Sequence, residues 1–192
     1  MNRLDRLLQD WRIGRAVRFV PLGSRVLDVG CHDGALFRRL GPGLRQGIGL
    51  DPALAGPLDG DRYRLLPGSF PLDAPDEPGS FDAITMLAVL EHVPSDQQPV
   101  VAGAAHRLLR PGGRLILTVP SPRVDTILDV LMRLRLLDGM EADQHYGFQP
   151  DDVEPLMLGA GLTLIEHARF QFGLNHLFVF ERPPRTPWVA SA

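Results

Sequence analysis

The chain has 192 residues, a formal net charge of −3 and 44% hydrophobic residues, which predicts one globular domain with a buried core. All 20 of its Lys and Arg residues are arginine, so the sequence contains no lysine. The missing lysine excludes a P-loop, Schiff-base catalysis and acyl transfer by a Ser-x-x-Lys site.

Other features of the composition bear on redox chemistry, membranes and nucleic acids. Cys31 is the single cysteine, which excludes an internal disulfide and a zinc site built from several cysteines. The first ten residues are too polar for a signal peptide, and no apolar run reaches the roughly 18 residues of a membrane span. A mildly acidic chain is also not typical of a nucleic-acid binder. We therefore expect a cytoplasmic protein without stable membrane insertion and without a nucleic-acid partner.

Apolar runs alternate with helical patterns along the chain. Apolar positions at helical spacing predict an N-terminal helical segment within residues 1–24, with a break near Gly14. Strands are predicted at residues 25–29, 46–50, 82–87, 114–119, 162–166 and 176–181, and helices at 33–40, 95–109, 123–137 and 150–159. This alternation predicts an α/β fold with a mainly parallel, doubly wound sheet.

The domain organisation follows from the same reading. Residues 1–182 are expected to form a single domain, and residues 183–192 a flexible tail. The predicted helix at 123–137 carries an apolar stripe within a 120–148 insertion. We interpret this insertion as core or as a lid on the acceptor side of a site, and a homodimer seam is the alternative. Segments 52–61 and 67–80 are short and proline-rich, which predicts a side of the sheet covered by loops.

The clearest chemical signal is the segment Val26–Gly34, in which an apolar strand leads into a glycine turn and then a helix. Glycine allows a ligand to approach the backbone closely, and ligands of open α/β sheets bind at the carboxyl ends of strands. Because Gly30 and Gly34 are separated by Cys31, His32 and Asp33, the spacing does not match the Gly-x-Gly-x-x-Gly fingerprint of dinucleotide binding.

Asp51 ends the second predicted strand, about twenty residues after the glycine turn. A carboxylate in this position can accept hydrogen bonds from both hydroxyls of a ribose. Taken by itself, Asp51 is equally compatible with capping the N-terminus of a helix.

Two further segments complete a recognisable order of motifs. Ser80–Ile84 leads to Leu90–Pro94, and His106–Leu115 contains Pro-Gly-Gly between a helix and a strand. With Asp28, Gly30 and Gly34, these segments resemble the motifs of class I S-adenosylmethionine (SAM)-dependent methyltransferases over residues 25–120. The closing part, 144–181, is similar to the end of the same family. The middle glycine of the family's first motif is replaced here by His32.

The resemblance implies a Rossmann-like sheet of seven strands, mostly parallel with the last strand antiparallel. It also implies SAM as the cofactor, with S-adenosylhomocysteine (SAH) as its product. The side chains and backbone groups expected around the cofactor belong to Asp28, Gly30, Cys31, His32, Gly34, Asp51, Pro52, Ser69, Phe70 and Leu87. In this set Ser69 is expected at the adenine amine, while Phe70 either stacks on the ring or belongs to the core.

The sulfonium of SAM is already activated, so such an enzyme mainly aligns the reactants and excludes water. A base is needed only where the acceptor loses a proton, and the candidates are His145, Tyr146 and His92. A metal site is not expected, because the Glu-x-x-Glu-His pattern of ubiquinone-pathway O-methyltransferases begins here with Ala88.

The resulting expectation is methyl transfer to a small-molecule, sugar or lipid-precursor acceptor. A homodimer is also considered as the form of the protein. Nucleic-acid subclasses do not fit, because residues 85–88 lack their Asn/Asp-Pro-Pro-Tyr motif. The missing lysines exclude relatives whose catalytic base is a lysine. A SAM-binding protein without catalysis is the first alternative, and an oxidoreductase of the NAD type is a less favoured one.

Overall fold

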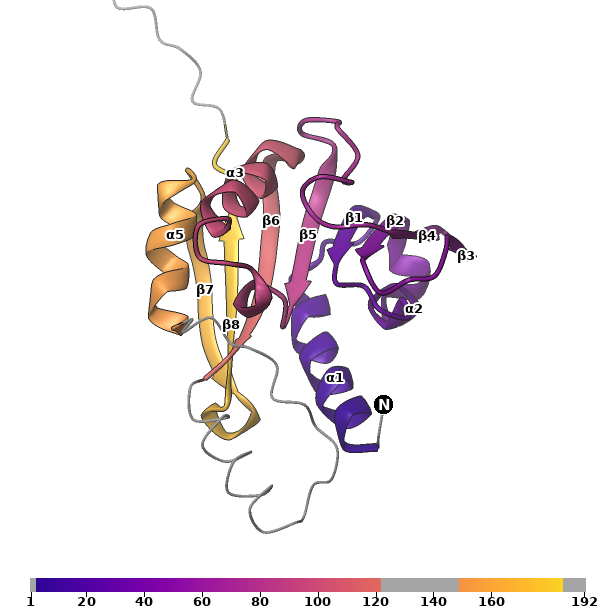
Figure 1. Ribbon diagram of the computed structural model, residues 1–192, viewed down its shortest axis with the longest axis horizontal. Helices are drawn as coiled ribbons and strands as arrows, with labels where there is room; N and C mark the ends of the chain where they lie inside the picture. Colours follow the sequence, from indigo (N-terminus) through magenta and orange to yellow (C-terminus); the bar gives the residue numbers. More distant parts are fainter. Residues whose placement is uncertain (1–2, 122–148, 185–192) are drawn as a thin grey trace, which may run out of the picture.

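The computed structural model describes residues 3–121 and 149–184 as one sheet with helices on both faces (Figure 1). The strands are β1 (Ser24–Val29), β2 (Leu44–Asp51), β3 (Leu58–Gly60), β4 (Tyr63–Pro67), β5 (Phe81–Leu87), β6 (Leu109–Pro120), β7 (Thr163–Phe170) and β8 (Asn175–Glu181). The α-helices are α1 (Arg3–Ala16), α2 (Ala35–Leu40), α3 (Gln98–Leu108) and α5 (Val153–Gly159). Single turns of 3-10 helix are η1 (Val17–Phe19), η2 (Gly41–Gly43), η3 (Leu90–His92), η4 (Pro150–Asp152) and η5 (Gln171–Gly173).

The strands follow the order β3-β4-β2-β1-β5-β6-β8-β7. Strands β4, β2, β1, β5 and β6 are parallel to their neighbours in this series, whereas β8 is antiparallel to both β6 and β7. From β1 the chain moves outward through β2 to β4 and then returns to β5 on the other side of β1. The direction of winding therefore reverses at β1, and the crevice at its carboxyl end is where such sheets bind ligands.

The predicted α/β class, the doubly wound sheet and the antiparallel last strand are confirmed. The predicted number of seven strands is wrong, because β3 adds an eighth strand antiparallel to β4 at the sheet edge. All three residues of β3 are exposed, so no buried apolar residue marked this strand in the sequence. The helix predicted at 123–137 lies outside the described residues.

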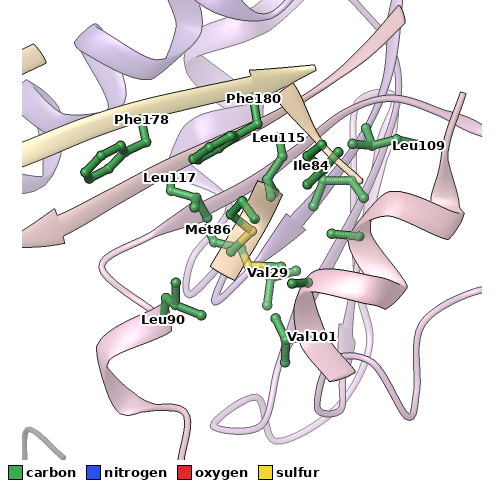
Figure 2. Close-up of a cluster of buried hydrophobic side chains, with 14 of the residues drawn as sticks. Val29, Ile84, Met86, Leu90, Val101, Leu109, Leu115, Leu117, Phe178 and Phe180 are labelled. Carbon is green, nitrogen blue, oxygen red and sulfur yellow. The ribbon is translucent and has the colours of Figure 1, made fainter. Parts of the chain in front are cut away.

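The sheet separates two layers of apolar side chains, which explains why its strands are apolar on both faces. One layer packs under α3 and α5 and contains Leu27, Met86 and Phe180 (Figure 2). The other layer packs under α1 and α2 and contains Val26, Phe37 and Ile116. We call these two surfaces of the sheet the α3 face and the α1 face.

Helix α1 continues through Gly14, so the predicted break at this residue is wrong. Ile13 and Ala16 on either side of the glycine are buried against the α1 face of the sheet. Burial of these side chains outweighs the roughly 1 kcal/mol by which glycine disfavours a helix. The consequence for the site is that α1 remains straight enough to reach past the carboxyl end of β1.

Candidate functional site

The turn after β1 has a left-handed backbone at three residues. The φ angle is +73° at Gly30, +46° at His32 and +76° at Gly34. A Cβ atom on Gly30 would lie 2.5 Å from Cγ2 of Val89, so both the backbone angle and the space favour glycine there. The N–H of Gly30 donates to the carbonyl of Leu50 over 2.8 Å, which ties the turn to the end of β2.

Asp51 lies beside this turn at the carboxyl end of β2. Its Oδ2 accepts a hydrogen bond of 2.8 Å from the N–H of His32, and its Oδ1 accepts one of 2.9 Å from the N–H of Ala53. A carboxylate offers about four acceptor positions, so these bonds fix the carboxylate and leave capacity for ligand hydroxyls. Residues 52–57 contain turn, bend and irregular backbone and no helix, and the helix-capping interpretation of Asp51 is therefore wrong.

A pocket of about 200 Å³ opens between the glycine turn, the end of β5 and helix α1. The described residues that line it are Gln9, Arg12, Ile13, Asp28, Gly30, Cys31, His32, Ala35, Leu36, Leu87 and Ala88. The predicted residues Asp28, Gly30, Cys31, His32 and Leu87 are thus brought together in one place. The side chain of His32 is 60% exposed, so the residue that replaces the family's glycine adds an imidazole at the edge of the pocket.

Two carboxyl groups are buried in this part of the molecule, Asp28 in the pocket lining and Glu91 in η3. Burial raises the pKa of Asp28 to about 7, against the hydrogen bond of 2.6 Å that Thr85 Oγ1 donates to Asp28 Oδ1, and the charge of Asp51 adds to the increase. Burial likewise raises the pKa of Glu91 to about 7, while its own backbone N–H and the charge of Arg12 lower it. The pocket therefore presents one carboxyl group with a pKa near neutral pH, Asp28, and its lining residue Arg12 acts through its charge on Glu91, which is not in the lining.

A sequence profile of the methyltransferase domain family matches residues 3–167. The chain belongs to this family. The expectation drawn from the motifs is therefore confirmed, and the oxidoreductase alternative is not supported.

Among the sequence relatives of this methyltransferase domain is the ubiquinone biosynthesis O-methyltransferase of Nitrosococcus oceani. It is 32% identical over 155 residues, which are 74% of this chain and 64% of the relative. The enzyme of the same name from Xanthomonas campestris is 34% identical over 167 residues, which are 79% of this chain and 65% of the relative. The matched part of the chain thus spans slightly less than two thirds of the length of these relatives.

Solved structures of methyltransferases share the fold of this domain. A methyltransferase of Haloferax volcanii, in complex with the Trm112 activator, superimposes with a TM-score of 0.70 at 18% identity, covering 91% of this chain and 88% of that one. A Burkholderia thailandensis N1-methyltransferase with bound 1,6-didemethyltoxoflavin and SAH gives a TM-score of 0.64 at 20% identity, covering 93% and 81%. These similarities support the Rossmann-like fold.

The residues expected at the adenine end of the methyltransferase cofactor lie near Asp51 but outside the pocket. The N–H of Gly68 is 3.3 Å from the carbonyl oxygen of Asp51, which places Ser69 next to the end of β2. Pro52 is exposed beside Asp51. Phe70 packs against the core layer on the α3 face, in agreement with the core alternative for this side chain.

The remaining predicted residues differ in how the structure places them. Cys31 is buried, and burial together with the charges of Asp28 and Asp51 raises the pKa of its thiol to about 12, so it packs as a small apolar residue. His92 is exposed in η3 and does not line the pocket within the described part of the chain. His145 and Tyr146 lie outside the described residues.

Sequence reasoning missed the contribution of α1 to the pocket. Gln9, Arg12 and Ile13 line it, but the amphipathic pattern of α1 does not distinguish these side chains from others on the helix. Thr85 was also missed, because only the pairing of β1 with β5 places it opposite Asp28.

In the described ranges, no group of three or more His, Cys, Asp or Glu side chains is placed to hold a metal ion. No described helix is long and apolar enough to cross a membrane.

Proposed function

We propose that this chain transfers a methyl group from SAM to a small-molecule acceptor, with sugars and lipid precursors included in that class. The observation that carries the proposal is the pairing of the glycine turn with Asp51. The turn can receive a ligand against its backbone, and the fixed carboxylate beside it has acceptor positions left for hydroxyl groups.

The residues present fit this cofactor. Gly30 has neither the backbone angle nor the space for a side chain, and therefore keeps the floor of the cleft open. The pocket of about 200 Å³ is smaller than the ~300–1,000 Å³ of typical ligand sites, so we assign to it the amino-acid part of SAM. Arg12 supplies a positive charge for a carboxylate, and Asp28, with its pKa of about 7, supplies a negative charge when it ionises beside an ammonium group. Asp51, Pro52, Ser69 and Phe70 would then border the nucleoside.

When bound, SAM supplies a methyl group on a sulfonium that is already a good leaving group. The task of the chain is to orient the two reactants and to exclude water. Leu87 and Ala88, at the end of β5, line the pocket. They lie on the other side of β1 from β2 and Asp51. A base is required only if the acceptor carries a proton of high pKa. For that role we propose His145 or Tyr146, with His92 as a further candidate.

The acceptor is proposed to carry a hydroxyl group. Two of the relatives are named as ubiquinone biosynthesis O-methyltransferases, and this supports an oxygen atom of a small molecule as the acceptor. A formal net charge of −3 does not favour a nucleic-acid acceptor. We also propose a cytoplasmic location and one domain over residues 1–182, with a tail at 183–192.

Calorimetric titration with SAH tests the cofactor site. Wild-type chain should bind SAH in a 1:1 complex, and Asp51→Ala should weaken binding by about 1–3 kcal/mol, or roughly 5- to 150-fold, because ribose hydroxyls lose their acceptor. Asp61→Ala, at a carboxylate exposed by 96%, is the matched control and should bind like the wild type. Equal SAH affinity in the wild type and Asp51→Ala would refute the assignment.

The presence of His32 in the glycine turn favours a second candidate, a protein that binds SAM without catalysis. The imidazole at the pocket edge would restrict how closely a ligand approaches the backbone. Phenolic acceptors incubated with SAM distinguish the two functions through SAH formation. Turnover in the wild type supports the enzyme, and loss of turnover in His145→Ala or Tyr146→Phe with unchanged SAH binding identifies the base. SAH binding without turnover of any acceptor would favour the second candidate.

A further inference from the structure

A second cavity, of about 920 Å³, lies at the opposite end of the strands from the cofactor site. Its lining comes from Arg25 near the start of β1, from the first half of β2, from β4 with Arg62 before it, and from Ser80, directly before β5. Ile48 and Leu66 place it on the α3 face, because both pack against the core layer under α3. We call it the arginine cavity, after Arg25, Arg45, Arg62 and Arg64, which line it.

The cavity exists because a helix is missing from one crossover. The chain returns from β4 to β5 across β2 and β1, and a right-handed connection of this kind passes over the α3 face. None of residues 68–80, all of which the structure describes, is helical. The sheet surface that a crossover helix would cover is therefore left as a hollow. The sequence prediction of a loop-covered side at 67–80 is confirmed.

The charge of this lining has one sign. The four arginines are its charged members, and no acidic side chain of the described residues lines the cavity. Each of the four arginines has an acidic partner that is not part of the lining, as in the pairs of Arg25 with Glu77 at 2.6 Å and of Arg64 with Asp59 at 3.3 Å. Because Glu77 and Asp59 are 60% and 77% exposed, these pairs contribute little free energy and can yield to a ligand.

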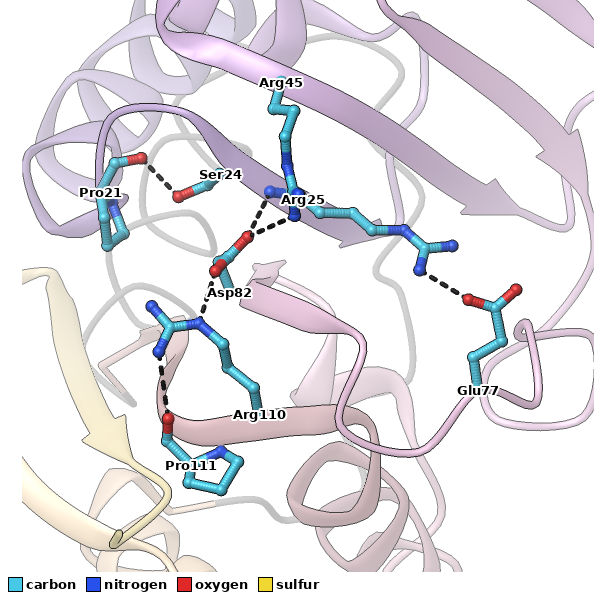
Figure 3. A network of polar contacts seen from close by, with 8 residues as sticks. All are labelled: Pro21, Ser24, Arg25, Arg45, Glu77, Asp82, Arg110 and Pro111. Carbon is cyan, nitrogen blue, oxygen red and sulfur yellow. Dashed lines mark hydrogen bonds and ion pairs between the residues drawn. The ribbon is translucent and has the colours of Figure 1, made fainter.

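Two buried polar atoms of the lining residues have no hydrogen-bond partner within the described structure, namely Nε of Arg25 and Oγ of Ser80. Buried polar atoms are nearly always paired. Arg25 is also held in place: its Cζ lies 4.8 Å from the centre of the Phe81 ring, and its backbone N–H donates to Asp82 Oδ2 over 2.7 Å (Figure 3). Arg25 is thus preorganised by its neighbours, while its buried Nε is not accessible to a ligand in the cavity.

The neighbouring arginine is held by the same carboxylate. Arg45 lies 3.1 Å from Asp82 Oδ2, and Asp82 Oδ1 accepts from Arg110 over 2.5 Å (Figure 3). Asp82, on β5, thereby links the amino-terminal ends of β1, β2 and β6. Strand pairing then sets the spacing of the cavity arginines, since Arg25 is aligned with Gln46 and Ile48 with Arg64. Adjacent strands are about 4.8 Å apart, so the guanidinium groups are distributed over three neighbouring strands.

We propose that the arginine cavity binds a small molecule carrying two or more linked phosphate groups. Guanidinium groups match phosphate oxygens in pairs of parallel hydrogen bonds, and arginines on three strands can contact more than one phosphate. The cavity volume falls in the usual range for small-molecule sites, ~300–1,000 Å³. A nucleic acid would require a broad basic surface, which a chain of net charge −3 does not provide. The site is separate from the proposed cofactor cleft.

Calorimetric titration of the full chain with pyrophosphate and, separately, with inorganic phosphate tests this proposal. Pyrophosphate should bind 1:1, more tightly than phosphate, and its affinity should fall as salt is raised. Arg64→Gln and Arg25→Gln should each weaken pyrophosphate binding by about tenfold or more, because each removes a charged hydrogen-bond donor. The side chain of Arg64 is exposed, so Arg64→Gln should fold like the wild type. The test therefore remains decisive even if Arg25→Gln does not fold.

Arg107→Gln is the matched control, because Arg107 forms a similar exposed ion pair with Asp76 outside the cavity. It should bind pyrophosphate like the wild type. Saturating SAH should leave the affinity unchanged, since the two sites lie at opposite ends of the strands. The proposal is overturned if pyrophosphate does not bind, if Arg107→Gln loses as much affinity as Arg64→Gln, or if SAH competes with pyrophosphate.

Discussion

Replacing Asp28 with asparagine removes a carboxyl group that the fold buries beside the cofactor pocket. Asparagine has nearly the same shape, and its Oδ1 can still accept the hydrogen bond that Thr85 donates to Asp28 Oδ1. What the variant loses is the titration. Burial raises the pKa of Asp28 from 3.8 to about 7, so the folded chain holds a proton that the unfolded chain releases at lower pH.

The sign and size of the effect follow from this difference. Between pH 3.8 and about 7 the unfolded chain has already lost the proton, and the free energy of unfolding of the wild type therefore falls as pH rises. Each pH unit inside that window corresponds to about 1.4 kcal/mol. From pH 5 to pH 7 the wild type should lose about 2 kcal/mol relative to Asp28→Asn, which is a difference of roughly 4–8 °C in Tm.

Urea denaturation of both proteins at pH 5, 6 and 7 measures the effect, because all other titrating groups are shared and cancel in the difference. Asp61→Asn, at an exposed carboxylate, should keep a constant difference from the wild type over the same range. A difference between wild type and Asp28→Asn that does not change with pH would refute the assignment of a raised pKa to this carboxyl group.

Three further predictions concern two glycines, one in the turn after β1 and one in α3, and the single cysteine. Gly30→Ala should reduce the free energy of unfolding by about 1–2 kcal/mol, because the added Cβ meets Val89 at a φ of +73°; unchanged stability in urea would contradict this. Gly103→Ala, on an exposed helical position with nothing within 4 Å of the new Cβ, should instead stabilise by about 0.5–1 kcal/mol, and a lower Tm would count against it. Cys31, with its thiol pKa near 12, should react with a thiol reagent at pH 7.5 only in urea, and rapid labelling of the native chain would show that the thiol is accessible.

The parts of the site that lie close together in sequence could be predicted. The turn from Gly30 to Gly34 is local, and the backbone angles that require glycine leave a visible pattern. Asp51 could be predicted as well, because it ends an apolar strand whose position after the turn is set by the length of one helix. The place of His32 within this turn could be predicted from the same local pattern, whereas its exposure is known only from the structure.

The parts that depend on contacts between distant segments could not be predicted. Arg12 and Gln9 reach the pocket only because α1 packs across the carboxyl end of β1. The raised pKa of Asp28 results from its burial, and it is opposed by the hydrogen bond from Thr85, which lies across the sheet on β5. The strand β3 could not be predicted because all three of its residues are exposed and leave no apolar pattern in the sequence.

The sequence by itself determined the fold class, the family and the order of the motifs, because these depend on apolar periodicity and on backbone constraints within short segments. It also determined that no lysine takes part in the chemistry. Only the tertiary structure decided which of the twenty arginines share a surface. Strand pairing aligns β1, β2 and β4, and the absence of a helix from residues 68–80 leaves Arg25 and Arg64 in one cavity. Charges far apart in sequence gain a common role only when the sheet brings them within a few ångströms of one ligand.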